Sequence, residues 1–503
     1  MSLAITYTRA QVGIDAPLVT VEVHLSGGLP SFAIVGLPET AVKESRERVR
    51  SALINSGFDF PQRRITVNLA PADLPKEGGR YDLAIAIAIL AATGQIPVDT
   101  LSNVEFIGEL ALSGELRSIT GVLPVALACR SADRKLFLPK QNQDDALLAN
   151  GLEVLPVSHL LQLCAHLTNT ELIPVQVGKK QRVEITQQYP DMQDVKGQAQ
   201  AKRALEIAAA GAHNLLLVGP PGSGKSMLAN RLPGLLPEMT EDETLEVAVI
   251  HSISQVNGDS LPQIRPFRAP HHTASSVALV GGGGNPKPGE ISLAHQGVLF
   301  LDELPEFSRK VLEVLREPME SGEILISRAA RQTTFPAQFQ LVTAMNPCPC
   351  GYFADGTDRC RCTPDQVRRY QSRVSGPLLD RIDLQLSVQA LSQQELMSHS
   401  SEEEGSGSVR DRVVACRHRQ LRRQGLPNQL LVGKQLEQCC QVSDSDREML
   451  AQALEKLQLS ARAYHRVLRV ARTIADLAGD EMVEQRHLFE ALSYRVSARN
   501  SFN

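Results

Sequence analysis

Stretches with the two-residue period of β-strands alternate with stretches of helical spacing over the first 180 residues. Apolar residues recur at every second position in residues 18–25 and 63–70, which is typical of half-buried strands. Residues 39–57 and 81–94 have the apolar spacing of helices. Strands and helices that alternate in this way predict an α/β or α+β domain over residues 1–180.

Two further segments have different patterns. Residues 190–392 carry glycine-rich loops and short, wholly apolar runs that predict buried strands. Residues 398–410 are acidic and rich in serine and glycine, which predicts a flexible linker. Residues 411–500 have helical spacing, and one predicted helix face consists of Val467, Val470, Ala471, Ile474 and Ala475. We therefore expect an α/β protein with domains over residues 1–180, 190–392 and 411–500, the last of them helical.

The composition limits the functional classes. The chain has 503 residues, of which 43% are hydrophobic and 21% charged, the balance of a globular protein. Its formal net charge of −4 excludes global basicity, so any nucleic-acid binding must use local patches. The sequence has neither an apolar run long enough to span a membrane nor the pattern of a signal peptide. We expect a soluble, cytoplasmic protein without membrane partners.

The stretch LLLVGPPGSGKSMLANRL joins an apolar strand, residues 215–218, to a predicted helix through a glycine-rich loop. This is the context in which a P-loop binds nucleotide phosphates through converging backbone amides and a helix N-terminus. Lys225 supplies a positive charge to the phosphates, and the Ser226 hydroxyl can ligate Mg²⁺. The predicted phosphate-binding loop consists of Gly219, Pro220, Pro221, Gly222, Ser223, Gly224, Lys225 and Ser226.

A second apolar strand, residues 298–301, ends in Asp302 and Glu303. Asp302 is predicted to hold Mg²⁺ through water, and Glu303 to orient and deprotonate the attacking water. A further strand ends in Asn346, from where an amide can reach the γ-phosphate or the water. Together with the P-loop, these side chains predict a Mg²⁺-dependent nucleotide hydrolase.

This series resembles the AAA+ ATPases, in which Walker A, Walker B and a sensor-1 residue follow in the same order. Arg381 matches the arginine finger of the chelatase-like branch, which reaches the γ-phosphate bound to the adjacent subunit, and Arg462 matches the sensor-2 arginine of a lid helix. Arg373 and Arg466 are competing candidates, and any of the four could instead be a surface arginine paired with a carboxylate. The resemblance implies ATP as substrate and a homo-hexameric ring whose active sites form between subunits.

Two insertions concern what such a motor acts on. Residues 267–298, with the pair His271 and His272, resemble the helix-2 insert of chelatase-like proteins; a structural loop role is favoured over metal binding for this pair. Residues 322–340 predict a β-hairpin whose tip carries Arg328 and Arg331 and which resembles the pre-sensor-1 hairpin. In that branch both insertions project into the central pore. The resemblance implies that these arginines bind DNA phosphates; the alternative is an exposed hairpin with solvated arginines.

The segment 76–130 resembles the proteolytic domain of Lon, which has the ribosomal-S5 domain-2-like fold. The residue that corresponds to the catalytic serine is Arg80, and the lysine position is occupied by Leu123. Since both catalytic groups are missing, we expect a degenerate scaffold without peptidase activity. It would serve assembly or contact DNA through Lys43, Arg46, Arg48 and Arg50, unless these residues only form a solvated helix face.

The degenerate Lon-like domain, the FRAPHHT and NPCPCG motifs and the helical segment are together similar to the ComM/YifB family of magnesium-chelatase-like AAA+ proteins. The likeness covers nearly the entire chain. It implies an ATP-driven hexameric helicase that promotes branch migration on single-stranded and branched DNA during natural transformation, with recombination proteins as candidate partners. Two alternatives stay open: a remodeller of a partner protein without DNA dependence, and an ATP-dependent protease, against which Arg80 and Leu123 argue.

Four of the nine cysteines lie close together after Asn346, in the pattern C-x-C-x₉-C-x-C. Four thiolates suit tetrahedral Zn²⁺, although two-residue separation within each pair is the more usual spacing. Reduced thiols without metal and disulfides are the alternatives. A closed zinc site would brace the loop between Asn346 and Arg381. The candidate ligands are Cys348, Cys350, Cys360 and Cys362.

Overall fold

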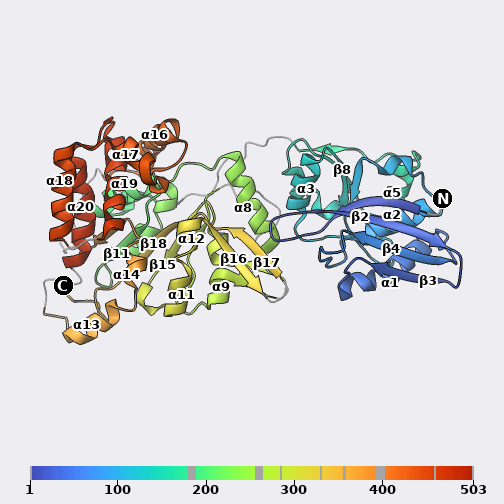
Figure 1. Ribbon diagram of the computed structural model, residues 1–503, viewed down its shortest axis with the longest axis horizontal. Coiled ribbons are helices and arrows are strands. Elements are labelled where there is room, and N and C mark those ends of the chain that lie inside the picture. The colour runs from blue at the N-terminus through green and yellow to red at the C-terminus, as the bar shows by residue number, and fades with distance from the viewer. Residues whose placement is uncertain are drawn as a thin grey trace. The chain divides into compact units, whose positions relative to one another are not determined.

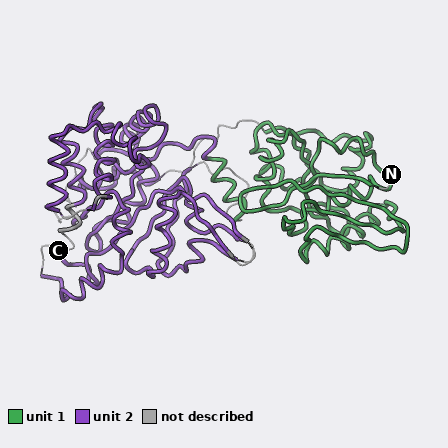
Figure 2. The backbone as a smooth tube through the Cα atoms, viewed as in Figure 1, with its two compact units in different colours: residues 1–184, 244–262 green, residues 185–243, 263–503 purple. Residues whose placement is uncertain are grey.

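The computed structural model of the chain describes residues 3–178, 189–254, 264–283, 286–328, 331–354, 358–390, 403–457 and 460–500. The chain forms two compact units, shown in Figure 2. The first consists of residues 1–184 with 244–262, and the second of residues 185–243 with 263–503. No helix among the described residues is both long and apolar enough to cross a membrane.

The first unit has two four-stranded sheets. One has the order β1-β2-β4-β3, in which β3 runs parallel to β4 and the other neighbours are antiparallel. The other has the order β10-β9-β8-β5, with β10 as its antiparallel edge. The strands are β1 (Leu3–Arg9), β2 (Leu18–Ser26), β3 (Ser31–Val35), β4 (Arg64–Ala70), β5 (Val104–Phe106), β8 (Lys135–Pro139), β9 (Glu153–Val157) and β10 (Gln176–Val177), with a small hairpin of β6 (Glu109–Leu110) and β7 (Leu116–Arg117).

Helix α2 forms the centre of this unit's core. Its sequence DLAIAIAILAA is apolar on all sides after Asp82, and every one of its residues is buried, as expected for a helix enclosed by other elements. The predicted strands at 18–25 and 63–70 and both predicted helices are confirmed. The helices of this unit are α1 (Thr40–Asn55), α2 (Asp82–Ala92), α3 (Val122–Ser131), α4 (Gln143–Leu147) and α5 (Leu160–Leu167).

Helix α8 (Glu241–Ser254) lies in sequence between the two Walker motifs, yet most of it belongs to the first unit. Ala248, Val249 and Ile253 form an apolar cluster with Leu123 of α3. The apolar face of α3 is therefore covered by a segment that comes about 120 residues later in the chain.

The second unit is built on a five-stranded sheet in the order β12-β15-β18-β11-β19, with all neighbours parallel. Its strands are β11 (Leu215–Val218), β12 (Phe267–Arg268), β15 (Val298–Leu301), β18 (Gln340–Met345) and β19 (Leu384–Ser387). The central strands are wholly buried runs, as predicted. Around them lie α6 (Ala199–Gly211), α7 (Lys225–Ala229), α9 (Ser276–Val280), α10 (Glu290–Leu293), α11 (Arg309–Val314), α12 (Pro318–Ser321), α13 (Pro364–Gln371) and α14 (Gly376–Leu379), with the short β13 (Gly281–Gly282) and β14 (Lys287–Pro288).

The last part of the chain is helical (Figure 1) and belongs to the same unit (Figure 2). Its helices are α16 (Ser406–Gln424), α17 (Gly433–Cys440), α18 (Asp444–Lys456), α19 (Ala461–Ala478) and α20 (Gln485–Asn500). The predicted helix face is confirmed, since Val467, Val470, Ala471, Ile474 and Ala475 of α19 are all at most 2% exposed. These residues share one apolar cluster with α6 and the parallel sheet.

The prediction of a flexible linker at residues 398–410 is wrong for residues 403–410. Residues 398–402 lie outside the described residues. Helix α16 already begins at Ser406, whose hydroxyl accepts a hydrogen bond of 2.7 Å from the Met192 amide. The acidic residues before it are engaged: Glu403 pairs with Lys202, and Glu404 with Arg412. Composition alone misled because it shows neither that Lys202 of the distant α6 pairs with Glu403 nor that Arg412 of α16 itself pairs with Glu404.

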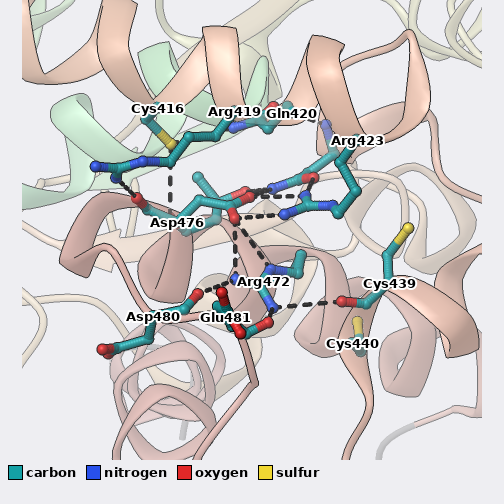
Figure 3. Close-up of polar contacts among 12 residues, drawn as sticks. Cys416, Arg419, Gln420, Arg423, Cys439, Cys440, Arg472, Asp476, Asp480 and Glu481 are labelled. Atoms are coloured by element: carbon teal, nitrogen blue, oxygen red, sulfur yellow. Dashed lines mark hydrogen bonds and ion pairs between the residues drawn. The ribbon is translucent and has the colours of Figure 1, made fainter.

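A buried charged network holds the helical segment together (Figure 3). The Asp476 carboxylate is 2% exposed and accepts hydrogen bonds from Arg423, Arg472 and Asn428 at 2.6–2.9 Å. Arg472, 1% exposed, also donates to the backbone oxygens of Cys439, Asp480 and Glu481. A buried ion pair is tolerated only when its remaining donors have hydrogen-bond acceptors, and these backbone oxygens accept from the remaining N–H groups of Arg472.

Candidate functional site

The predicted nucleotide site forms where three neighbouring parallel strands end. Leu301 of β15 lies opposite Thr343 of β18, and Val218 of β11 lies opposite Met345 of β18. The residues that follow these strands, Gly219, Asp302 and Asn346, therefore emerge at one edge of the sheet. Ligands of open parallel sheets bind at this carboxyl-terminal edge.

The P-loop has the backbone that phosphate binding requires. Gly222 and Gly224 have φ values of +78° and +87°, a conformation that residues with a Cβ rarely adopt. The Lys225 ammonium donates to the backbone oxygens of Gly219 and Pro220 at 2.7 and 2.8 Å and to Oδ1 of Asn346 at 3.2 Å. Burial lowers the pKa of Lys225, and the nearby Asp302 carboxylate opposes this shift.

The two predicted magnesium ligands contact each other directly. The Ser226 hydroxyl donates to Oδ2 of Asp302 over 2.5 Å, which joins the start of α7 to the end of β15. A hydroxyl and a carboxylate at this spacing offer the hard oxygen ligands that Mg²⁺ prefers. Ser226 and Asp302 would hold a Mg²⁺ ion, which would supply positive charge to bound phosphates.

Glu303 has a partner that the sequence did not reveal. Its Oε2 lies 3.0 Å from Nδ1 of His272, and its own φ is +53°, which is uncommon for a residue other than glycine. The rings of His271 and His272 are 4.1 Å apart, but His271 bonds to Thr273 rather than to Glu303. The adjacent pair His271 and His272 is the sequence signal for this contact, and the predicted structural loop role does not include it.

The predicted finger and sensor-2 arginines lie at the opposite edge of the same sheet. Arg381 precedes β19, pairs with Glu320 at 2.5 Å and is 6% exposed. Burial lowers its pKa, and the nearby Arg462 is among the cations that lower it further. Because the strands between the edges are about 13 Å long, Arg381 is separated from the P-loop of its own chain by the length of the sheet.

The two competing arginines have other partners. Arg466 donates to the buried Asp383 carboxylate over 2.7 Å and to the Arg381 backbone oxygen over 2.8 Å. Arg373 pairs with Glu306 at 3.0 Å, just after β15 and so near the chain's own nucleotide site. Arg466 is thus held in a buried ion pair, whereas Arg373 is about half exposed.

The predicted hairpin is present as β16 (Glu323–Arg328) and β17 (Arg331–Pro336), which pair antiparallel with Arg328 opposite Arg331. The tip residues 329 and 330, and the side chains of both arginines, lie outside the described residues. The backbone register places the two arginines at the end of the hairpin.

The four clustered cysteines converge. Their sulfur atoms all lie within 4.8 Å of one another, and three of the Sγ–Sγ distances are 3.3, 3.7 and 3.9 Å. Cys348 is fully buried and the other three are partly exposed. The sulfurs thus surround one point in the loop that follows Asn346. The candidate ligands are Cys348 and the three partly exposed cysteines, Cys350, Cys360 and Cys362.

The Lon-like segment has no nucleophile at the corresponding position. Arg80 is 7% exposed and donates to Gln11 and to the Thr120 backbone oxygen at 2.6 and 2.8 Å, so it ties three segments together. Leu123 is buried against α8. Both side chains fill space and make structural contacts, and neither can act in peptide hydrolysis.

The basic helix of this unit divides into two sets of side chains. Arg48 pairs with the buried Asp82 at 2.7 Å and is occupied structurally. Arg46 and Arg50, together with Arg63, instead line a hollow of about 210 Å³, which is also lined by Phe32, Phe60 and one carboxylate, Glu47. The Arg50 guanidinium lies 5.6 Å from the Phe60 ring centroid. We call this the arginine groove.

Comparison with known proteins agrees with this geometry. Residues 191–396 match the family described as "Magnesium chelatase, subunit ChlI", residues 21–142 "Subunit ChlI of Mg-chelatase", and residues 403–495 "Magnesium chelatase, subunit ChlI C-terminal". The chain is 53% identical to competence protein ComM of Haemophilus influenzae, over 99% of this chain and 98% of that one. The chain belongs to the ComM/YifB family.

Other relatives extend this result. YifB of Escherichia coli is 50% identical over 99% of this chain and 98% of its own. Lon protease 2 of Bacillus subtilis is 31% identical over 121 residues, 24% of this chain and 21% of that protein. Membership of the magnesium-chelatase-like AAA+ proteins implies ATPase activity with ATP and Mg²⁺, as the strand-end residues do.

Proposed function

We propose that this ComM/YifB protein is a ring-forming motor that couples ATP hydrolysis to translocation on single-stranded and branched DNA, and that it promotes branch migration during recombination, as in natural transformation. The 53% identity over nearly the whole chain to a protein named for competence carries this proposal. Competence leads to integration of incoming DNA, a process in which branch migration extends the paired region.

In the proposed cycle, Lys225 binds the phosphates, Ser226 and Asp302 hold Mg²⁺, and Glu303 activates water, with Asn346 as the sensor. Their convergence at one sheet edge supports these roles. Arg381 and Arg462 lie at the other edge, so they would act on nucleotide bound by the neighbouring subunit of a homo-hexamer. Arg381 must then release Glu320, with which it pairs in the single chain.

The proposal assigns DNA contact to the hairpin arginines, Arg328 and Arg331. An antiparallel hairpin with one arginine at each side of its tip suits binding to phosphates without base recognition. The proposal also includes one structural Zn²⁺ held by the four clustered cysteines, whose sulfur spacing supports it. We place the protein in the cytoplasm, with recombination proteins as candidate partners.

The test is ATP turnover with and without a synthetic branched DNA. We expect DNA to stimulate turnover, Glu303→Gln to abolish it, and the double variant Arg328→Ala/Arg331→Ala to lose the stimulation while it keeps basal turnover. Arg410→Ala/Arg447→Ala, which removes two exposed arginines from α16 and α18, is the charge-matched control. Turnover that is indifferent to DNA would favour the remodeller of a partner protein, and normal stimulation of the hairpin variant would refute the hairpin assignment.

A further inference from the structure

The four cysteine sulfurs have the spacing of a metal site. A tetrahedral Zn²⁺ with Zn–S bonds of about 2.3 Å places its sulfurs about 3.8 Å apart. The three measured Sγ–Sγ distances, 3.3, 3.7 and 3.9 Å, lie around this value, and all exceed the length of a disulfide bond. Four protein ligands would leave no open coordination position, so the metal would be structural rather than catalytic.

The loop that carries this cluster packs against the P-loop. Gly351, between the two cysteine pairs, has a φ of +87°, and its amide donates to Cys348 Sγ over 3.2 Å. A Cβ at Gly351 would lie 2.4 Å from Cδ of Pro221 and 2.7 Å from its Cγ. The Pro221 ring therefore rests directly on the Gly351 backbone, where no larger residue fits.

The same loop is also tied to the nucleotide site through the chain itself. Cys348 is two residues after Asn346, whose side chain accepts a hydrogen bond from Lys225, and the intervening Pro347 oxygen accepts one of 3.0 Å from Gln371. The P-loop is thus in contact with the cysteine loop at Pro221 and with its root at Lys225. Displacement of the cysteine loop would therefore move both Pro221 and Lys225.

We infer that one Zn²⁺ bound by Cys348, Cys350, Cys360 and Cys362 holds Gly351 against Pro221, so that nucleotide affinity depends on zinc although zinc takes no part in hydrolysis. This inference rests on the proposed nucleotide site and is independent of DNA. Loss of the metal would release this support of the P-loop and shift it, although no phosphate-binding side chain is removed from the chain.

Zinc content and nucleotide affinity, measured on the same full-length preparation, test the metal's role. We expect about one zinc per chain by mass spectrometry of freshly purified, reduced protein. Cys360→Ser/Cys362→Ser removes two partly exposed ligands; we expect it to lose the zinc and to raise the Kd for a fluorescent ATP analogue on the order of tenfold. Cys439→Ser, a partly exposed cysteine outside the cluster, is the control and should change neither quantity.

A second set of variants keeps all four ligands. Gly351→Ala should retain zinc yet weaken nucleotide binding, because the new methyl group collides with the Pro221 ring. The double variant Gly351→Ala/Pro221→Ala lacks the ring atoms that are struck, so it should bind more tightly than Gly351→Ala alone. These two variants test the contact between Gly351 and Pro221 even if the cysteine variant does not fold.

Several outcomes would overturn the inference. One is a freshly purified wild-type protein that binds nucleotide although it contains less than about a tenth of a zinc per chain. The others are a folded zinc-free variant with unchanged Kd and a Gly351→Ala variant with wild-type affinity. None of these measurements involves DNA, so failure of the proposed DNA coupling would leave the result standing. Wild-type protein that binds no nucleotide would instead refute the proposed function.

Discussion

Nδ1 of His272 lies 3.0 Å from Oε2 of Glu303, and this contact joins the insertion between the Walker motifs to the residue proposed to activate water. The resemblance of this insertion to the helix-2 insert of chelatase-like proteins implies that it projects into the central pore of a ring. His272 is therefore placed to position Glu303 according to what the insertion contacts.

His272→Ala should lower ATP turnover on the order of tenfold, because an attacking water held by a misplaced base is poorly aligned. The described partners of His272 are Glu303, His271 and Phe307, which lie outside the P-loop. The Kd for ATP should therefore stay unchanged, which steady-state kinetics and equilibrium binding together can check. His271→Ala is the matched control, because that ring bonds to Thr273 instead. Equal losses in the two variants would argue against a positioning role, and His272→Gln should recover part of the activity.

Mixing two inactive variants tests whether Arg381 acts on a neighbouring subunit. Arg381→Ala and Glu303→Gln should each be inactive alone. In mixed rings, however, an Arg381→Ala subunit can receive an intact arginine from a Glu303→Gln neighbour. Random assembly predicts that about a quarter of the sites become complete, measurable as recovered ATP turnover. A mixture of Lys225→Ala with Glu303→Gln repairs no site and is the control; if neither mixture recovers activity, the finger is not Arg381.

The buried pair Asp383–Arg466 predicts an effect of pH on stability. Burial alone would raise the pKa of Asp383, but Arg466, His213 and the Asn214 amide hold it well below its usual range. The stability that the ionised Asp383 contributes is therefore fully present above the pKa of about 4 that an aspartate has in the unfolded chain. It is lost as the pH falls toward the lower pKa of Asp383 in the folded protein. Asp383→Asn should lower the free energy of unfolding at neutral pH by about 3 kcal/mol, because Arg466 is left buried without its partner.

Denaturant unfolding between pH 3 and pH 7 checks this prediction. The variant should lose less stability than the wild type as the pH is lowered below about 4. If the free energy of unfolding fell equally steeply with pH in the two proteins, Asp383 would not be responsible for the loss of stability in acid.

The arginine groove predicts a second DNA contact that is separable from stability. Arg46→Ala/Arg50→Ala/Arg63→Ala should weaken binding to single-stranded DNA and reduce its salt dependence, since up to three phosphate contacts are removed per chain. Arg48→Ala, from the same helix, should leave DNA affinity unchanged but destabilise the first unit by about 3 kcal/mol, because Asp82 loses its cation. Fluorescence anisotropy and thermal unfolding distinguish the two effects; an unchanged salt slope in the triple variant would refute the contact.

The parts of the site that sequence could predict are those encoded within a few neighbouring residues. A buried strand followed by a P-loop, or one that ends in Asp302 and Glu303, specifies its own local geometry. The partners of those residues come from distant segments: His272 for Glu303, Glu320 for Arg381, and Asp383 for Arg466. Ion pairs of this kind have no periodicity and no fixed spacing, so only the fold reveals them.

The helical start of α16 at Ser406 was missed for a related reason, because one of the two cations that pair with the residues before it, Lys202, comes from a distant segment. Residues 403–410 have a linker's composition, and it is Lys202 and Arg412 that make their charges tolerable in a packed structure. By contrast, the buried face of α19 was predictable because it rests on one helix's own apolar spacing.

The assignment of α8 to the first unit means that the polypeptide passes between the units three times, near residues 184, 243 and 262. A protease that cuts once near residue 184 would therefore not set the first unit free. The amino-terminal fragment would stay attached through its apolar contacts with α8, and two bands on a denaturing gel would elute together in size-exclusion chromatography. A fragment expressed as residues 1–184 alone would present Leu123 and its neighbours to solvent and should self-associate.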